Sequence, residues 1–257
     1  MNVFDGPLGR PTPASGLTVR GLTLRFRAEI LFQDLSFDLP PGRFTCLLGP
    51  SGVGKTSLLR ALAGLMPVRD AEIRCDDTGS PAGRIAWMDQ RDQLLPWLNA
   101  RDNVTLGSRL RGEPADGERA RMLLAEVGLA GQAETQPAAL SGGMRQRVAL
   151  ARTLYEDRPI VLLDEPFAAV DAPTRHRLQR LAARLLAGRT VLLVTHDPLE
   201  ALILGHEVHV LSGRPARIAA TLRPDGLPPR SAASPALAAM QAELLDRLAN
   251  ADSEGLP

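Results

Sequence analysis

The sequence is poor in lysine, cysteine and aromatic residues, and each shortage narrows what the chain can be. Its 30 basic residues include a single lysine, Lys55, and its formal net charge of +1 gives no bias toward nucleic acid. Two cysteines, Cys46 and Cys75, cannot build a disulfide framework and suit a reducing cytosol. Aromatic residues make up 4% of the chain, so aliphatic side chains must fill most of its core.

Long apolar runs are also missing. None approaches the roughly 18 residues that a membrane-spanning helix needs, and the N-terminus has no basic and then apolar signal peptide. The chain has 257 residues, 44% of them hydrophobic, which is enough for one large domain or for one domain with an inserted subdomain. We therefore expect a soluble protein, which can still dock onto a membrane protein.

The pattern of residues divides the chain into three parts. Residues 1–16 are rich in Pro, Gly, Ser and Thr and are predicted to form a flexible tail. Residues 17–217 hold the main domain, and residues 218–257 form a Pro-rich link and an amphipathic C-terminal helix. Within the main domain, residues 91–157 are largely helical and broken by Gly and Pro, which predicts an inserted helical subdomain.

The main domain has the pattern of an α/β fold. Apolar alternation over residues 17–39 predicts antiparallel strands at its start. Fully apolar runs predict buried strands over residues 44–48, 160–164 and 190–196, and helical spacing follows over residues 55–62 and from about Pro173. Buried strands that alternate with helices indicate a parallel core sheet, here joined to an N-terminal antiparallel β subdomain.

The stretch GPSGVGKTS fits the phosphate-loop pattern G-x-x-x-x-G-K-[ST] between a strand and a helix. Glycines let such a loop wrap round phosphates, and the helix N-terminus adds partial positive charge. The compact ammonium of Lys55 fits between phosphates where the wider fork of arginine would crowd the loop. The alternative is a glycine-rich turn with a surface lysine. The predicted nucleotide-binding residues are Gly49, Pro50, Ser51, Gly52, Val53, Gly54, Lys55, Thr56 and Ser57.

A second group of candidates suits magnesium and water chemistry. Asp164 ends the run IVLLD and can hold Mg²⁺ together with the hydroxyl of Thr56, and Gln90 can complete the metal shell. Glu165 is placed to polarise an attacking water molecule. The alternatives are two acids that merely cap a strand, and a surface glutamine.

Two further segments carry candidate phosphate contacts. His196 follows an apolar strand directly and can touch the γ-phosphate, whereas His176, His206 and His209 are expected to be surface or packing residues. LSGGM begins a helix, where Ser141, Gly142 and Gly143 can present amide groups and a hydroxyl to an anion. Its alternative is an ordinary serine N-cap. Two phosphate-binding segments favour one nucleotide that contacts both, which a dimer would allow.

Taken together, GPSGVGKTS, Gln90, LSGGM, IVLLDEP, Asp171 and His196 resemble the ATP-binding subunits of ABC transporters, from about Leu17 to Arg217. The resemblance implies a P-loop ATPase fold and a head-to-tail dimer. Each ATP would lie between the phosphate loop of one copy and the LSGGM segment, including Met144, of the other. Asp171 would link the two sites, and Phe26 would stack on adenine unless it is a core residue.

Some residues depart from the family pattern. Met144 replaces the commoner glutamine of LSGGQ, Asp89 stands where many members have an aromatic residue, and AAV replaces SAL before Asp171. LSGGMRQR and LLPWL resemble the nitrate, sulfonate and taurine importer group. MDQRDQLLPWL, LARTLYEDRP and VLSGRPAR look most similar to subunits assigned to import of hydroxymethylpyrimidine, a thiamine precursor.

The resemblance implies an ATPase that couples ATP hydrolysis, with Mg²⁺ as cofactor and Lys55, Glu165 and His196 as catalytic residues, to solute uptake. Its partners would be a second copy, a transmembrane permease and, indirectly, a solute-binding protein, with no nucleic acid. It would lie peripherally on the cytoplasmic face of the inner (plasma) membrane. Trp97 and Leu98 would contact the permease, or else pack in the core.

Other ATPases with related motifs fit less well. Chromosome ATPases need a long coiled coil before LSGG, but only 85 residues (140 − 55) separate Lys55 from Leu140. Translation factors usually carry two such domains. A GTPase would need an N-K-x-D motif, which is absent because the one lysine of the sequence, Lys55, follows a glycine rather than an asparagine. An export or lipoprotein-release ATPase stays open as an alternative.

Overall fold

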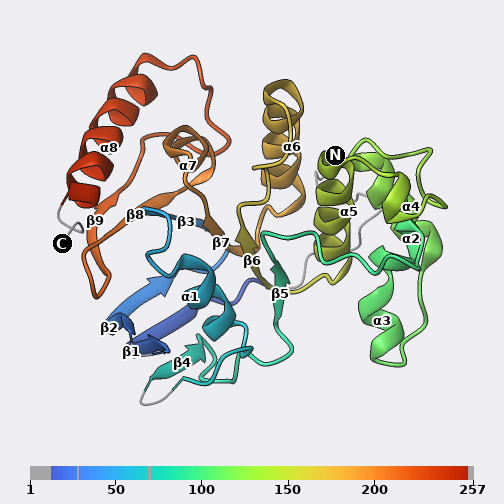
Figure 1. Cartoon of the computed structure of the whole chain (residues 1–257), viewed down its shortest axis with the longest axis horizontal. Coiled ribbons are helices and arrows are strands. Elements are labelled where there is room, and N and C mark those ends of the chain that lie inside the picture. Colours follow the sequence, from blue (N-terminus) through green and yellow to red (C-terminus); the bar gives the residue numbers. More distant parts are fainter. Residues whose placement is uncertain (1–12, 28, 69–70, 254–257) are drawn as a thin grey trace.

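The computed structural model of the chain describes residues 13–27, 29–68 and 71–253 (Figure 1). Residues 1–12, most of the predicted flexible tail, lie outside these described residues. Gly16, at the end of that predicted tail, donates its amide to Asp76 Oδ2 at 2.8 Å. In the described part of the chain, no helix combines the length and the apolar character needed to cross a membrane.

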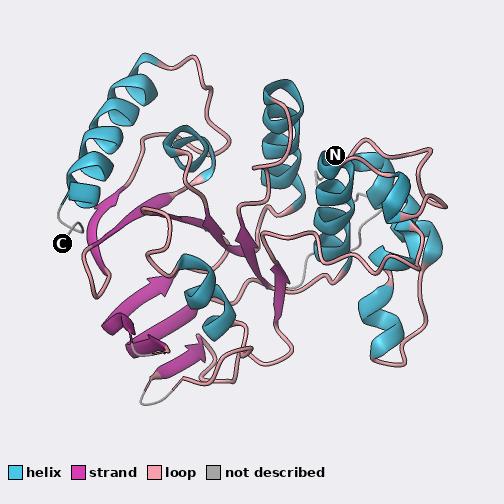
Figure 2. Cartoon of the chain, in the orientation of Figure 1, coloured by secondary structure: helices cyan, strands magenta, loops and turns pink. Residues whose placement is uncertain are grey.

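A six-stranded sheet forms the centre of the molecule, in the order β5-β6-β7-β3-β8-β9 (Figure 2). Five strands run parallel: β3 (Phe44–Leu48), β5 (Ile85–Met88), β6 (Ile160–Asp164), β7 (Thr190–Val194) and β8 (Glu207–Ser212). All residues of β3, β6 and β7 are buried, as their apolar runs predict. The parallel strands share one carboxyl-terminal edge, where functional side chains of such sheets usually lie.

The predicted N-terminal antiparallel strands are confirmed. β1 (Leu17–Phe26) pairs with β2 (Glu29–Leu39) and with β4 (Glu72–Cys75) in a separate three-stranded sheet. Alternate residues of β1 are buried, since successive side chains of a strand point to opposite faces. This sheet therefore covers part of the central sheet with one apolar face.

The same alternation gives the central sheet two packed faces. Phe44, Cys46 and Leu48 join one core with the long helices, whereas Leu47 joins a second core with α1 (Lys55–Leu62) and the antiparallel sheet. Figure 1 shows α6 (Ala172–Leu185), α7 (Pro198–Leu204) and α8 (Pro235–Ser253) above the sheet, and α1, β1 and β2 below it. The fold is thus α/β, with layers on both sides of a mostly parallel sheet.

The segment between β5 and β6 is helical, as the sequence predicts. It holds α2 (Ala100–Val104), α3 (Leu106–Leu110), α4 (Gly117–Glu126), the short 3₁₀ helix η1 (Pro137–Ala139) and α5 (Gly142–Tyr155). These helices lie beside the sheet in Figure 1, and α5 packs its buried Val148 and Leu150 into the same core as α6 and α7. The helical segment is therefore attached to the sheet mainly through α5.

The C-terminal part differs from the sequence-based expectation. Residues 217–222 form β9 (Arg217–Leu222), a strand antiparallel to β8, so the predicted boundary after Arg217 falls at the start of a strand of the central sheet. Leu237 and Leu244 of α8 are buried in the core. The link before α8 is held by Arg230, whose guanidinium donates to the carbonyl groups of Leu202, Gly205, Pro224, Asp225 and Gly226.

Candidate functional site

The glycine-rich segment Gly49–Ser57 joins the end of β3 to the start of α1. Gly52 and Gly54 have φ values of +80° and +103°, which residues with side chains rarely adopt. A Cβ atom on Gly54 would also lie 2.9 Å from Cε2 of Phe32. The loop can therefore wrap tightly, and the first amide groups of α1 face it without a capping side chain, as anion binding requires.

Lys55 is folded into this loop. Its Nζ atom donates to the carbonyl oxygens of Gly49 at 2.6 Å and Pro50 at 2.8 Å, and the residue is 7% exposed. A phosphate oxygen carries negative charge and is a stronger acceptor than a neutral carbonyl. The ammonium group thus lies inside the loop, at a place where a phosphate could replace the carbonyl contacts.

Asp164 lies at the carboxyl end of β6 and is 1% exposed. Its Oδ2 atom has no hydrogen-bond partner among the described residues. Burial raises the pKa of Asp164 above its ordinary value, and a hydrogen bond with Thr56 opposes that shift. A buried carboxylate oxygen without a partner is costly unless a ligand supplies one.

The oxygen atoms of Asp164 and Thr56 fit a magnesium ion. Mg²⁺ is usually held by one or two carboxylates together with substrate phosphates, and Thr56 belongs to the phosphate loop itself. The third predicted ligand, Gln90, contacts Glu165, the residue after Asp164: its Nε2 atom donates to Oε2 at 3.2 Å. The structure thus joins two of the three predicted metal ligands and places Gln90 beside the predicted water-polarising acid.

Glu165 and His196 meet at the same edge of the sheet. Nδ1 of His196 lies 3.2 Å from Oε2 of Glu165, and the histidine side chain is 61% exposed. The backbone of Glu165 has φ +47°, an uncommon value for a residue with a side chain, and its amide donates to the Val194 carbonyl at 2.9 Å. The strand β7 ends at Val194 rather than at His196 as predicted, so the histidine lies in the turn beyond it.

The LSGGM segment forms the N-terminus of α5. Ser141 is the N-cap, and its hydroxyl accepts the amide of Met144 at 3.2 Å. A Cβ atom on Gly143 would lie 3.1 Å from the carbonyl oxygen of Ala169, so little room exists there for a side chain. The serine does cap its helix, and the two glycines leave the first turn open. Figure 1 shows that α5 and α1 lie well apart in space within this one copy.

Three other predicted residues lie at the surface or at a helix end. Phe26 is 51% exposed with the Arg27 guanidinium 5.6 Å from its ring centre, which rules out the core alternative. Asp171 caps α6 by accepting the amide of Thr174 at 3.0 Å, and this contact lowers its pKa. Trp97 is 69% exposed and so is no core residue either.

Gln146 is a site residue that the sequence does not reveal. It lies on α5 and is 5% exposed. Its Nε2 atom donates to the Glu165 carbonyl at 2.9 Å, and its Oε1 atom accepts the Ala169 amide at 2.9 Å. A polar residue on the buried face of a helix is the one sequence signal that could have pointed to it.

The other three histidines are surface or packing residues, as expected, and His176 is exposed on α6. His206 accepts the amide of Phe44 at 3.0 Å, and His209 lies 2.8 Å from the hydroxyl of Thr221. Burial lowers the pKa of both imidazoles.

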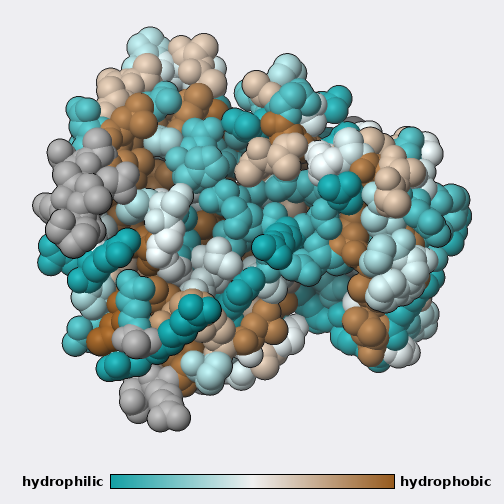
Figure 3. Space-filling model, viewed as in Figure 1, coloured by the Kyte–Doolittle hydropathy of each residue, from teal (hydrophilic) through white to brown (hydrophobic). Residues whose placement is uncertain are grey.

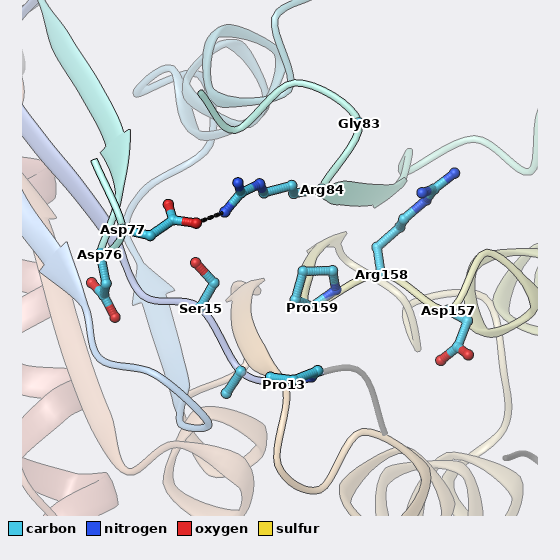
Figure 4. Close-up of a pocket in the computed structure, with 10 residues that line it drawn as sticks. Pro13, Ser15, Asp76, Asp77, Gly83, Arg84, Asp157, Arg158 and Pro159 are labelled. Carbon is cyan, nitrogen blue, oxygen red and sulfur yellow. Dashed lines mark hydrogen bonds and ion pairs between the residues drawn. The ribbon is translucent and has the colours of Figure 1, made fainter. Parts of the chain in front are cut away.

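A hollow of about 470 Å³ lies at the opposite end of the parallel strands, next to the starts of β5 and β6 (Figure 4). Its two arginines are paired: Arg84 with Asp77 at 2.6 Å, as Figure 4 shows, and Arg158 with Glu156 at 3.9 Å. The phosphate loop, Asp164 and Glu165 all belong to the other edge. We therefore take the carboxyl-terminal edge as the candidate site.

Known proteins share both the sequence and the fold. A family model described as "ABC transporter" matches residues 32–168. The chain is 46% identical over 242 residues to the aliphatic sulfonates import ATP-binding protein SsuB 1 of Rhodococcus jostii, covering 93% of the chain and 95% of that protein. It is 43% identical over 244 residues to SsuB of Delftia acidovorans, covering 94% and 97%.

Two solved structures agree with this fold. The chain matches the dimeric post-hydrolysis state of the ATP-binding cassette MJ0796 bound to ADP and Pi with a TM-score of 0.73 and 27% identity, over 82% of the chain and 100% of that one. A second dimeric structure of MJ0796 matches with a TM-score of 0.74 and 26% identity, over the same shares.

Proposed function

This chain belongs to the ABC transporter family as an ATP-binding subunit with ATPase activity, and from that premise we propose that it powers the import of an aliphatic sulfonate or a closely similar solute. The observation that carries the proposal is the 46% and 43% identity to two sulfonate importer subunits over more than nine-tenths of the chain. The sequence likeness to hydroxymethylpyrimidine importers has no such support and is kept as an outcome of the test.

In the proposed reaction, the phosphate loop binds ATP. Lys55 exchanges its two carbonyl acceptors for phosphate oxygens, and the first amide groups of α1 add further donors. Asp164 and Thr56 would hold Mg²⁺, which neutralises charge on the phosphates when it is bound. The unpaired Oδ2 of Asp164 supports this assignment.

Glu165 orients the attacking water and accepts its proton, and His196 contacts the γ-phosphate. The 3.2 Å contacts of Glu165 Oε2 with His196 and with Gln90 support this assignment, because they place two polar side chains around one carboxylate oxygen. Gln90 comes before the helical segment in the sequence, so a movement of that segment can change the contact between Gln90 and Glu165.

We propose that the working unit is a head-to-tail dimer. The Ser141–Met144 segment lies on a helix that packs on one face of the sheet, whereas α1 packs on the other. A second copy could bring its own Ser141–Met144 segment to this chain's phosphate loop, with Phe26 exposed for stacking on adenine. The dimeric structures of the similar cassette MJ0796 support this arrangement.

The proposed permease contact is the segment from Gln90 to Trp97 with the helices that follow. Trp97 is 69% exposed, and Leu110 at the end of α3 is 79% exposed. Figure 3 shows an apolar patch over the lower end of the helical segment, where α3 lies. This surface would attach the chain to the cytoplasmic face of the membrane, with a solute-binding protein acting on the other face.

The test is to isolate the tagged chain with its permease in mild detergent and to reconstitute that complex in proteoliposomes with the solute-binding protein. We expect an alkanesulfonate to stimulate ATP hydrolysis, and the alkanecarboxylate of equal length to serve as the matched control. Stimulation by hydroxymethylpyrimidine or nitrate instead would overturn the sulfonate assignment. Recovery of an export complex would overturn import altogether.

A further inference from the structure

Glu200 is a buried acid that no step proposed above uses. It lies in the first turn of α7 and is 4% exposed. Its Oε2 atom accepts a hydrogen bond from the hydroxyl of Thr195, while Oε1 makes no well-formed hydrogen bond among the described residues. The side-chain amide of Gln179 lies near the carboxyl group and opposes the rise of its pKa, but it does not satisfy Oε1. Because a buried polar atom without a partner is costly, a water molecule or another group is expected there.

A small cavity lies between Glu200 and the proposed hydrolytic residues. It has a volume of about 40 Å³, and its wall includes Glu165, Thr195, His196 and Glu200. A cavity of this size with several polar wall atoms can hold a water molecule. Such a water could join the buried acid to the Glu165–His196 pair.

Thr195 forms a second connection, through the backbone. Its hydroxyl donates to Glu200 and accepts the amide of Asp197 at 3.0 Å. These two bonds hold the backbone on both sides of His196, which lies between Thr195 and Asp197. Asp197 Oδ1 then accepts the amides of Leu199 and Glu200 and caps α7. The conformation of the turn that carries His196 therefore depends on the carboxyl group of Glu200.

We propose that Glu200 is a positioning residue for Glu165 and His196, and that it acts through Thr195 and through a water molecule in the cavity that these residues share. This inference rests on the roles proposed above for Glu165 and His196. It adds a residue that touches neither ATP nor metal but fixes the two that act on the water and the γ-phosphate.

The surroundings of Glu200 favour its neutral form near neutral pH. Burial raises its pKa to about 7, and the nearby Asp197 acts in the same direction. A neutral carboxyl group can donate a hydrogen bond to the cavity water, whereas the ionised group can only accept. The other charged or polar groups that face Glu200 are Arg175 and Gln179 of α6, Cys46 of β3, and Glu165 and His196 across the cavity.

Paired substitutions test the role. Glu200→Gln keeps the shape and the hydrogen bonds of the neutral acid, and Glu200→Leu removes them. We expect Glu200→Leu to lower kcat at least about tenfold with KM for ATP unchanged, since a misplaced catalytic group costs rate rather than binding. Glu200→Gln should restore most of kcat and lose the change of kcat with pH near 7. Glu243→Gln, an exposed residue of α8, is the matched control.

Thr195→Val provides an independent test, because it removes the hydroxyl link and leaves the acid in place. We expect Thr195→Val to lower kcat in the same way as Glu200→Leu, and it still tests the proposal if Glu200→Leu does not fold. Wild-type kcat and pH profile in either folded variant would overturn the proposal, as would a lower melting temperature with kcat and KM unchanged. Full activity of Glu165→Gln would instead refute the proposed role of Glu165, so the two failures are distinguishable.

Discussion

Gln146 joins the helix that begins at the Ser141–Met144 segment to the loop that carries Glu165. Its side-chain amide makes two bonds of 2.9 Å, one to the Glu165 carbonyl and one to the Ala169 amide, two residues before Asp171. A shift of α5 when its N-terminus meets a nucleotide would therefore be felt at Glu165 of the same chain. This contact offers a physical link between the two nucleotide sites of the proposed dimer.

Gln146→Leu tests whether this contact affects catalysis as well as stability. It removes the side-chain partner of two part-buried backbone groups, the Glu165 carbonyl and the Ala169 amide, which should cost about 1–3 kcal/mol of unfolding free energy in total. We expect kcat to fall while ATP affinity at the phosphate loop stays near wild type, because no contact with the loop is lost. Urea unfolding and steady-state hydrolysis measure the two effects, and an unchanged kcat in the folded variant would show that the link is structural alone.

Lys55→Arg tests why the chain's one lysine stands where it does. The ammonium group lies within 2.8 Å of two loop carbonyls and is almost fully buried, so the wider guanidinium should not fit beside a phosphate. We expect the rate of ATP hydrolysis, measured as released phosphate, to fall at least about a hundredfold, as when one charge-stabilising donor is removed. Wild-type turnover of this charge-conserving variant would contradict the role given to Lys55.

Phe26→Ala tests adenine stacking. The ring is half exposed at the end of β1, so its removal should not disturb the core. We expect ATP affinity to weaken about tenfold, within the range that aromatic stacking on a base contributes. Phe26→Trp is the matched control and should bind as the wild type does. Equal dissociation constants for Phe26→Ala and wild type, from titration calorimetry, would remove Phe26 from the site.

The pKa of Glu200 makes stability depend on pH. The unfolded chain ionises this acid near its ordinary value of 4.5, whereas the folded chain ionises it only at about 7. Its contribution is therefore fully present below pH 4.5, and it is lost as the pH rises to about 7. Relative to wild type, Glu200→Gln should become more stable across this window, by at most about 3 kcal/mol. Unfolding at several pH values measures the difference, and a constant difference between pH 4.5 and 8 would refute the shift.

Much of the fold could be predicted because its signals are local. The run FTCLL and the glycine-rich loop after it specify a buried strand, a tight turn and a helix, and the structure begins and ends β3 and α1 where the sequence places them. The run IVLLD likewise gives β6 its bounds. Each depends on neighbouring residues, so no knowledge of distant contacts is needed.

What could not be predicted depends on contacts between distant residues. β9 alternates exposed and half-buried residues after Pro215, and only its pairing with β8 makes it a strand of the central sheet. β7 stops at Val194, and the next residue, Thr195, uses its hydroxyl to bond the distant side chain of Glu200. Gln146 contacts Glu165 and Ala169, which lie 19 and 23 positions further along the chain. The residue type of a glutamine in a helix does not predict which distant groups it will contact.

The central claim is that two copies share each nucleotide, and the variant Glu165→Gln, which we expect to bind ATP without hydrolysing it, tests that claim most directly. Light scattering after size exclusion should show a dimer at saturating Mg·ATP and a monomer without nucleotide, because the bound ATP is not consumed. Adding Ser141→Arg, at the exposed start of α5, should return the protein to a monomer while the phosphate loop still binds ATP. A Glu165→Gln chain that binds Mg·ATP and stays monomeric at all concentrations would contradict the account.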